Sequence, residues 1–170
     1  MENLNITIKL DNGLNALLNE NDQTAEIIKS KEVRGDIIIP KFVNYNNKQF
    51  PIIRINDYAF EYNHFINSIS FEKDSVVRSI GKSVFYYCYI QNFTIPTHLN
   101  NFDDFWCENA FELKEINFSS ENQFFSKYNN LFLLYREDLQ KIQFDVLFFA
   151  PRNIIGLIKV PDFIKRIGPF

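Results

Sequence analysis

"SIGKSVFYYCYIQNFTIP", residues 79–96, places Ile80-Gly81, Phe85 and a lone cysteine ahead of an alternating apolar run that stops at Pro96. Alternating apolar and polar residues are typical of a strand with one buried face. Proline ends such a strand because it has no amide proton to donate. Taken alone, the stretch also fits a redox motif or an amphipathic helix. Whether the same spacing recurs elsewhere in the chain distinguishes these interpretations.

The spacing does recur on both sides, in "IIRINDYAFEYNHFINSISF" (52–71) and "LNNFDDFWCENAFELKEINF" (99–118). Phe60 and Cys107 occupy the slot of Phe85, which gives steps of 25 and 22 residues. A step held near 23 residues indicates stacked repeat units, because one unit alone cannot bury its apolar face. The sequence therefore predicts a solenoid in which Phe60, Phe85 and Cys107 are vertical neighbours.

Each unit is predicted to hold a longer strand, a shorter strand and a turn. The "VFYYC" segment (84–88) is about one helical turn long, and its phenylalanine is expected to point inward. Cys88 falls in the slot of Asn63 and Ala110, so we interpret it as a small turn residue and not as a reactive thiol. Gly81 is expected to ease the tight turn because it lacks a side chain.

Residues 1–34 are predicted to form a β-hairpin cap. Two alternating segments surround Asp11-Asn12-Gly13, a strong hairpin signal, and a third strand is expected over 25–28. Such a hairpin would cover the edge of the first unit. The repeats are predicted to fill 35–170, beginning with "GDIIIP" (35–40) and followed by an insertion at "NYNNKQFP" (44–51).

An enlarged, hairpin-bearing repeat is predicted at about 119–153, from the apolar segments Leu131 to Tyr135 and Val146 to Phe149. The repeat resumes in "LIKVPDFIKRIGPF" (157–170), where Ile167-Gly168 matches Ile80-Gly81. Because the chain stops at Phe170 in the middle of a unit, we expect that the natural protein continues or that this end pairs with something.

Composition excludes several classes of function. The formal net charge of -3 and the pI near 5.4 leave no basic excess for a nucleic-acid partner. No apolar run approaches the roughly 20 residues of a membrane helix, so this segment is expected not to insert into membranes. The N-terminus lacks the pattern of a secretory signal, and two cysteines are too few for a disulfide framework.

The residues that could form a chemical site also fit ordinary structural roles. Metal binding is disfavoured because the only candidates have no close ligand pair: His64, Cys88, His98 and Cys107. The acidic group of Asp103, Asp104 and Glu108 would need a deep cleft to cleave glycosides, and is predicted to be solvated turn residues. With no nucleotide or nucleophile motif, no catalytic residues and no cofactor are expected. Three sequons, beginning at Asn5, Asn92 and Asn117, would be glycan acceptors in a eukaryotic secretory route, but a chain rich in asparagine also contains such triplets by chance.

The pattern I-x-I-P, a gap, then I-G-x-x-A-F-x-x-C resembles the BspA-like leucine-rich repeat family. It is carried by "FTIP", "RINDYAFEYN", "SIGKSVFYYC" and "KVPDFIKRIG". The resemblance implies a right-handed leucine-rich-repeat solenoid, α/β leaning to mostly β, with short helical or 3-10 turns on the convex side. It also implies adhesion to host or matrix proteins from the surface of bacteria or protists, without catalysis.

A candidate partner-binding face follows from the outward positions of the longer strands. Side-chain alternation places six residues on one ladder pointing away from the core: Ser68, Ser70, Asn92, Thr94, Glu115 and Asn117. The ladder is either simply the solvent-exposed face of a sheet or the surface that binds a protein partner. The tyrosines at 86, 87 and 89 form a second candidate contact patch.

The leading hypothesis is a non-enzymatic protein-interaction module of a surface or secreted adhesin-like protein. An intracellular scaffold, which would be cytoplasmic, and the accessory repeats of a larger enzyme remain alternatives. The sequence leaves the partner and the oligomeric state open.

Overall fold

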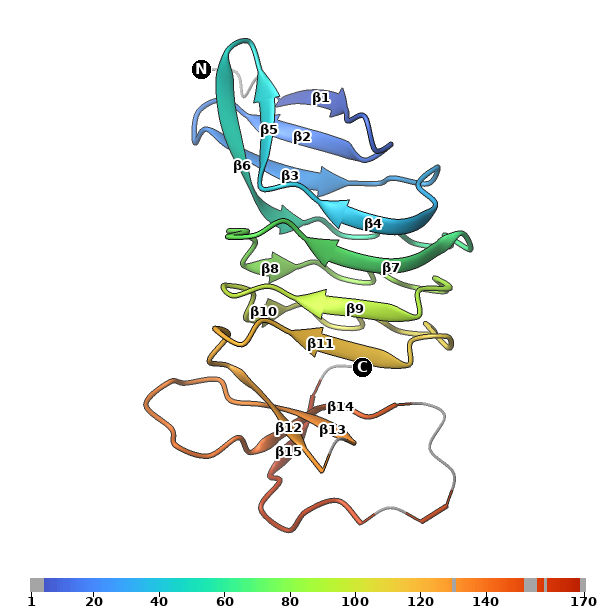
Figure 1. Ribbon diagram of the computed structural model, residues 1–170, viewed down its shortest axis with the longest axis vertical. Helices are drawn as coiled ribbons and strands as arrows, with labels where there is room; N and C mark the ends of the chain where they lie inside the picture. Colours follow the sequence, from blue (N-terminus) through green and yellow to red (C-terminus); the bar gives the residue numbers. More distant parts are fainter. Residues whose placement is uncertain (1–4, 130, 152–155, 158, 169–170) are drawn as a thin grey trace.

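The computed structural model describes residues 5–129, 131–151, 156–157 and 159–168. Within these residues every regular element is a β-strand and none is a helix. The chain passes repeatedly between two parallel sets of strands, and successive repeats lie beneath one another along the long axis (Figure 1). Phe170, where the last unit was expected to be cut, lies outside the described residues.

One sheet is built from the longer strand of each repeat. Its four strands pair in parallel, in the order β11-β9-β7-β4: β4 (Gly35–Ile39), β7 (Ile66–Phe71), β9 (Asn92–Ile95) and β11 (Glu115–Phe118). Phe93 is in register with Ile69 on one side and Ile116 on the other. The predicted repeat is confirmed here, because equivalent apolar positions are Cα partners.

A second parallel set is built from the shorter strands. It joins the end of β6 (Lys48–Ile55) to β8 (Ser79–Ile80) and β10 (Asn101–Phe102), with Ile55, Ile80 and Phe102 in register. Gly81 follows β8, and a Cβ atom there would lie 2.6 Å from the backbone nitrogen of Asp57. The glycine is therefore required because the neighbouring unit approaches so closely.

The segments between the two sheets are turns, so the predicted helical or 3-10 turns were wrong. Some amide protons bond back along the chain, as from Cys88 N to Phe85 O (3.0 Å). Others donate to the next unit, as from Phe60 N to Val84 O (3.0 Å) and from Phe85 N to Trp106 O (2.8 Å). Residues with positive φ interrupt each turn at matching positions, which prevents a continuous helix: Tyr58, Ser83 and Phe105, and again Tyr62, Tyr87 and Asn109.

Aromatic rings fill the space between the sheets. The Phe60 and Phe85 rings are stacked, with 5.7 Å between centroids and 8° between planes. Cys107 continues this column, as predicted, and Trp106 beside it supplies the missing ring by contacting Phe85 and Phe148. The third unit thus keeps its register although a small residue replaces the phenylalanine.

The N-terminal strands form the predicted hairpin and third strand. They pair antiparallel, and β3 then pairs parallel with β6: β1 (Asn5–Lys9), β2 (Asn15–Asn19) and β3 (Thr24–Ile28). The predicted insertion is a hairpin of β5 (Phe42–Tyr45) with β6, turning at Asn46 and Asn47, and it projects from the sheets (Figure 1).

The third sheet has the order β12-β13-β14-β15: β12 (Phe125–Tyr128), β13 (Phe132–Tyr135), β14 (Val146–Phe149) and β15 (Arg166–Ile167). The predicted antiparallel pairing of the two apolar segments is confirmed by β13 and β14. Sequence reasoning missed β12. The match of Gly168 to Gly81 also holds, since Gly168 N donates to Leu147 O (2.8 Å) just as Gly81 N donates to Ile55 O (2.8 Å).

Candidate interaction surface

The outward side of the β4-β7-β9-β11 sheet carries the six residues of the predicted partner-binding face. Along β9, Phe93 and Ile95 are buried whereas Asn92 is exposed and Thr94 is half-buried. The pleat of a strand imposes this alternation, and the parallel register repeats it on each neighbour. We call this surface the strand face; its residues are Asp36, Ile38, Ser68, Ser70, Asn92, Thr94, Glu115 and Asn117.

Two rows cross the strand face. In the first, Asn92 is the Cα partner of both Ser68 and Glu115. In the second, Thr94 is the partner of Asn117. The structure therefore brings together the residues that sequence analysis placed on one ladder.

β4 adds two residues that the sequence analysis missed. Asp36 is in register with Ser68, and Ile38 is in register with Ser70 and is 55% exposed. The sequence signal for these two residues was the alternation in "GDIIIP". Asp36 and Ile38 are exposed there, and they alternate with the buried Ile37 and Ile39.

Polar contacts link neighbouring strands across the strand face. The Ser68 hydroxyl donates to Asp36 Oδ1 (2.6 Å). At the other end, Lys127 of β12 donates to Asn117 Oδ1 (3.1 Å) and lies 3.8 Å from Glu115 Oε1. Exposed contacts of this kind add little to stability, but they hold the side chains in a defined arrangement.

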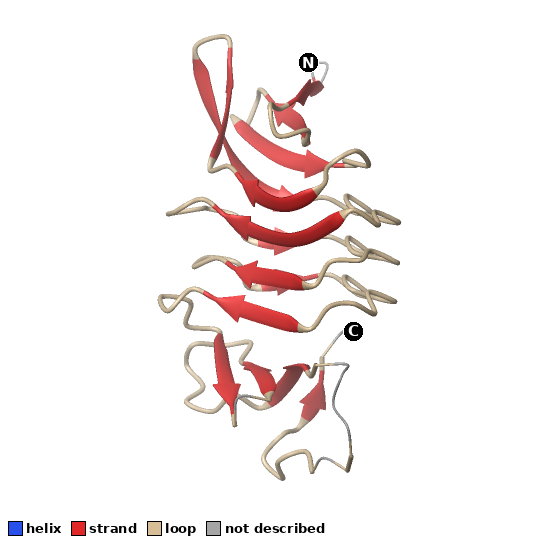
Figure 2. Cartoon of the chain, turned by 45° about the vertical axis from the view of Figure 1, so that its right-hand side comes forward, coloured by secondary structure: helices blue, strands red, loops and turns tan. Residues whose placement is uncertain are grey.

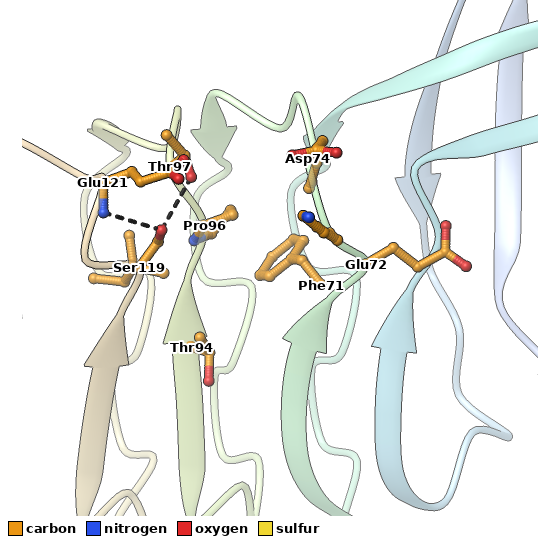
Figure 3. A pocket seen from close by; sticks show the side chains of 11 residues that line it. Phe71, Glu72, Asp74, Thr94, Pro96, Thr97, Ser119 and Glu121 are labelled. Carbon is orange, nitrogen blue, oxygen red and sulfur yellow. Dashed lines mark hydrogen bonds between the residues drawn. The ribbon is translucent and has the colours of Figure 1, made fainter.

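A pocket of about 220 Å³ lies where β7, β9 and β11 end (Figure 3). Thr94 belongs to both the pocket and the strand face, so the two surfaces are continuous. The hydroxyl oxygens of Thr97 and Ser119 are 3.1 Å apart in a hydrogen bond, and Ser119 Oγ also accepts the Glu121 amide proton (3.3 Å). Its lining holds three carboxylates, those of Glu72, Asp74 and Glu121, and one cation, Lys73.

Two of the candidate chemical groups of the sequence, Cys88 and Asp103, have structural roles. Cys88 is buried, and burial raises the pKa of its thiol to about 11, so it is protonated at neutral pH. Asp103 accepts from the Arg54 guanidinium (2.8 Å), which also bonds Asp57 (2.9 Å). Asp103 therefore contacts a cation and not a second carboxylate. No three His, Cys, Asp or Glu side chains converge on a metal position within the described part of the chain.

A family model for the BspA type leucine-rich repeat region matches residues 41–168 in six copies. The chain belongs to the BspA-type leucine-rich repeat family. The search of curated proteins gave no match to it.

Solved structures resemble this BspA-type chain in fold at low sequence identity. The pneumococcal vaccine antigen PcpA is 13% identical with a TM-score of 0.51, over 69% of this chain and 39% of that one. A leucine-rich repeat protein of Bacteroides capillosus is 20% identical with a TM-score of 0.48, over 67% and 99% of the two chains. A leucine-rich cell surface protein of Faecalibacterium prausnitzii is 13% identical with a TM-score of 0.35, over 84% and 60%. The alignment thus spans about two fifths of the PcpA chain.

Membership of this family suggests a role in protein interaction. None of the described residues forms a helix long and apolar enough to cross a membrane.

Proposed function

We propose that this BspA-type region is a right-handed solenoid that acts as a non-enzymatic protein-interaction module. The observation that carries the proposal is the row of polar side chains that Asp36, Ser68, Asn92 and Glu115 form in register across four parallel strands of the strand face. Parallel strands joined by a crossover are right-handed in nearly every protein, which supports the handedness. Repeat arrays of this kind present extended faces to partners.

The strand face is the proposed binding surface. Its six predicted residues combine hydroxyl, amide and carboxylate groups, to which β4 adds Asp36 and an exposed isoleucine. A protein partner can hydrogen bond to the polar rows and cover Ile38 at the same time. An apolar centre with a polar rim is typical of protein interfaces.

The flanking segments fit a supporting role in this proposal. Residues 1–34 would act as the cap of the array at 35–170, since Asn12 Nδ2 donates to Ile38 O (3.1 Å) at the edge of β4. The repeat at about 119–153 would be an enlarged unit that carries the β13-β14 hairpin. Lys127 of that unit reaches the strand face.

The proposed setting is the cell surface or the outside of the cell, with a host or matrix protein as the partner. The description of PcpA as a vaccine antigen is in keeping with an exposed location. Surface labelling of intact cells tests the location. Capture of the chain by a panel of immobilised, purified matrix proteins tests the partner class.

A double variant tests the strand face itself. Asn92→Arg with Thr94→Arg places two long cations on the middle strand and is expected to weaken capture at least tenfold, since bulky charges at an interface centre are poorly accommodated. The matched control, Asn101→Arg with Thr7→Arg, changes exposed residues of the other sheet and should leave capture unchanged. The adhesin proposal would be overturned if the protein were not labelled on intact cells and no matrix protein captured it.

A further inference from the structure

Seven exposed aromatic side chains gather on the turns that lead from the shorter strands into β7, β9 and β11. They are Tyr58, Tyr62, Phe65, Tyr87, Tyr89, Phe105 and Phe111, each between 39% and 60% exposed. These turns lie above one another along one edge of the molecule (Figure 2). We call this surface the aromatic turn face; it lies at the opposite ends of the longer strands from the pocket at Thr94 and Ser119.

The rings contact each other from unit to unit. Tyr62 and Tyr87 are stacked at 5.6 Å with 14° between planes, and Tyr87 meets Phe111 edge-on at 6.2 Å. His64 is stacked on Tyr89 at 4.3 Å. Tyr62, Tyr87 and Phe111 therefore form a row of contacting rings over three successive units.

The backbone does not require an aromatic residue at four of these positions: Tyr58, Tyr62, Tyr87 and Phe105. Tyr62 and Tyr87 have φ values of 56° and 50°, a left-handed conformation that bulky residues rarely adopt. Asn109 fills the same slot of the next unit, with φ 56°, so the turn forms without a ring. The slot four residues earlier shows the same freedom. Ser83 adopts there the left-handed conformation that Tyr58 and Phe105 have in the other two units. Exposed rings in strained positions, where Asn or Ser serves equally well, indicate a role outside folding.

The charge of the same turns favours a cationic partner. The turns 56–65, 81–89 and 103–112 carry two, zero and four carboxylates, against a single lysine, Lys82. Arg54 pairs with two of these carboxylates and Lys29 with a third, Glu61. In the 103–112 turn Glu112 forms an ion pair with Lys114 (3.9 Å), so Asp104 and Glu108 are the two carboxylates of this turn that have no ion pair with a described residue.

Arg34 shows how an arginine fits this surface. Its guanidinium carbon lies 3.8 Å from the centroid of the Phe65 ring. Arginine stacks on aromatic faces more readily than lysine does, because its planar cation is more weakly hydrated. One ring of the aromatic turn face therefore already holds the contact that a basic partner would repeat on the others.

We propose that the aromatic turn face binds a basic protein segment whose arginine side chains stack on the exposed rings and pair with the carboxylates of the 103–112 turn. This site is separate from the strand face and does not depend on the function proposed for it. The geometry requires a segment with several arginines along its length, since the rings run over three successive units.

The test measures binding of fluorescein-labelled octa-arginine by anisotropy at 0.15 M salt, with octa-citrulline as the neutral probe of the same shape. The key variant is Tyr62→Asn with Tyr87→Asn and Phe105→Ser, which puts into each slot the residue that another unit already has there. It is expected to unfold at the same temperature as the parent or higher, and to bind octa-arginine at least about tenfold more weakly. Asp104→Asn with Glu108→Gln should weaken binding severalfold, and the strand-face control Asn92→Ser should not change it.

Octa-arginine binding that far exceeds octa-citrulline binding, and that the aromatic variant loses, would establish the site. Equal binding of the two probes would overturn it. Full affinity in the folded aromatic variant would overturn it as well, since bare charge attraction would then explain the binding. Binding of neutral glycans with no binding of octa-arginine would assign the rings to another ligand class and also overturn the proposal.

Discussion

The rings of Phe60 and Phe85 lie parallel at 5.7 Å, although 25 residues separate them in the chain. The contact exists because each repeat returns the chain to the same place in the cross-section. The amide of Phe60 then bonds to the unit that holds Phe85. Folding and surface display both rest on this vertical alignment.

Removing the central ring should destabilise the whole array. Phe85 is fully buried and contacts Phe60, Phe93 and Trp106. Phe85→Ala is expected to lower the free energy of unfolding by about 3–5 kcal/mol, measured by urea denaturation. The control Phe111→Ala removes a ring that is 60% exposed and should cost well under half as much. Equal losses from both would contradict the stacked core.

Gly81→Ala tests the close approach of neighbouring units. The added Cβ would lie 2.3 Å from Asp57 Oδ1 and 2.6 Å from Asp57 N, and the backbone atom cannot move without breaking the turn. We expect a loss of roughly 2 kcal/mol or more in the free energy of unfolding. Gly35→Ala is the comparison, because it has a positive φ but open space around it. A neutral Gly81→Ala variant would refute this explanation of the glycine.

Asn63 and Cys88 share a slot but should respond differently to alanine. The Asn63 side chain donates to Val33 O (3.1 Å) and accepts from the amides of Phe65 (2.8 Å) and Ile66 (3.2 Å). Asn63→Ala leaves these buried groups unpaired and should cost about 2 kcal/mol or more. Cys88→Ala introduces the residue that the next unit has in this slot, Ala110, and should lower the free energy of unfolding by only about 1 kcal/mol. Thermal unfolding of the two variants side by side decides the point.

The Cys88 thiol makes the protein sensitive to alkali. Burial raises its pKa from 9.0 to about 11, so the unfolded chain loses this proton at a lower pH than the folded chain does. The contribution of the protonated Cys88 thiol to the free energy of unfolding is fully present below pH 9. It should fall by about 2–3 kcal/mol as the pH rises towards 11. Cys88→Ala should lack that part of the decline. Identical pH profiles for parent and variant between pH 8 and 11 would contradict the assignment.

Periodic apolar residues made much of the fold predictable. The slot shared by Phe60, Phe85 and Cys107 located the turns, and the alternation around Phe93 located the longer strands. The six predicted strand-face residues lie in the expected rows for the same reason. Asp36 and Ile38 could have been added from the alternation in β4.

Features without a periodic apolar signal were not predictable. The turns were expected to be helical because "VFYYC" is one turn long, but left-handed residues such as Tyr87 direct amides towards the next unit. The β5-β6 hairpin was foreseen only as an insertion. The slot that Cys88 shares with Asn63 was interpreted from size and turn chemistry, whereas the Asn63 amide group links two units, which sequence spacing cannot reveal.

NMR measurement of interproton contacts between repeats tests the central claim most directly. With phenylalanine rings selectively labelled, the account predicts strong contacts between the Phe60 and Phe85 rings, and between the backbones of Phe93 and Ile116 in adjacent parallel strands. Observation of both sets in solution would establish that successive repeats lie on one another. A folded protein that shows neither set would contradict the stacking, and with it both proposed surfaces.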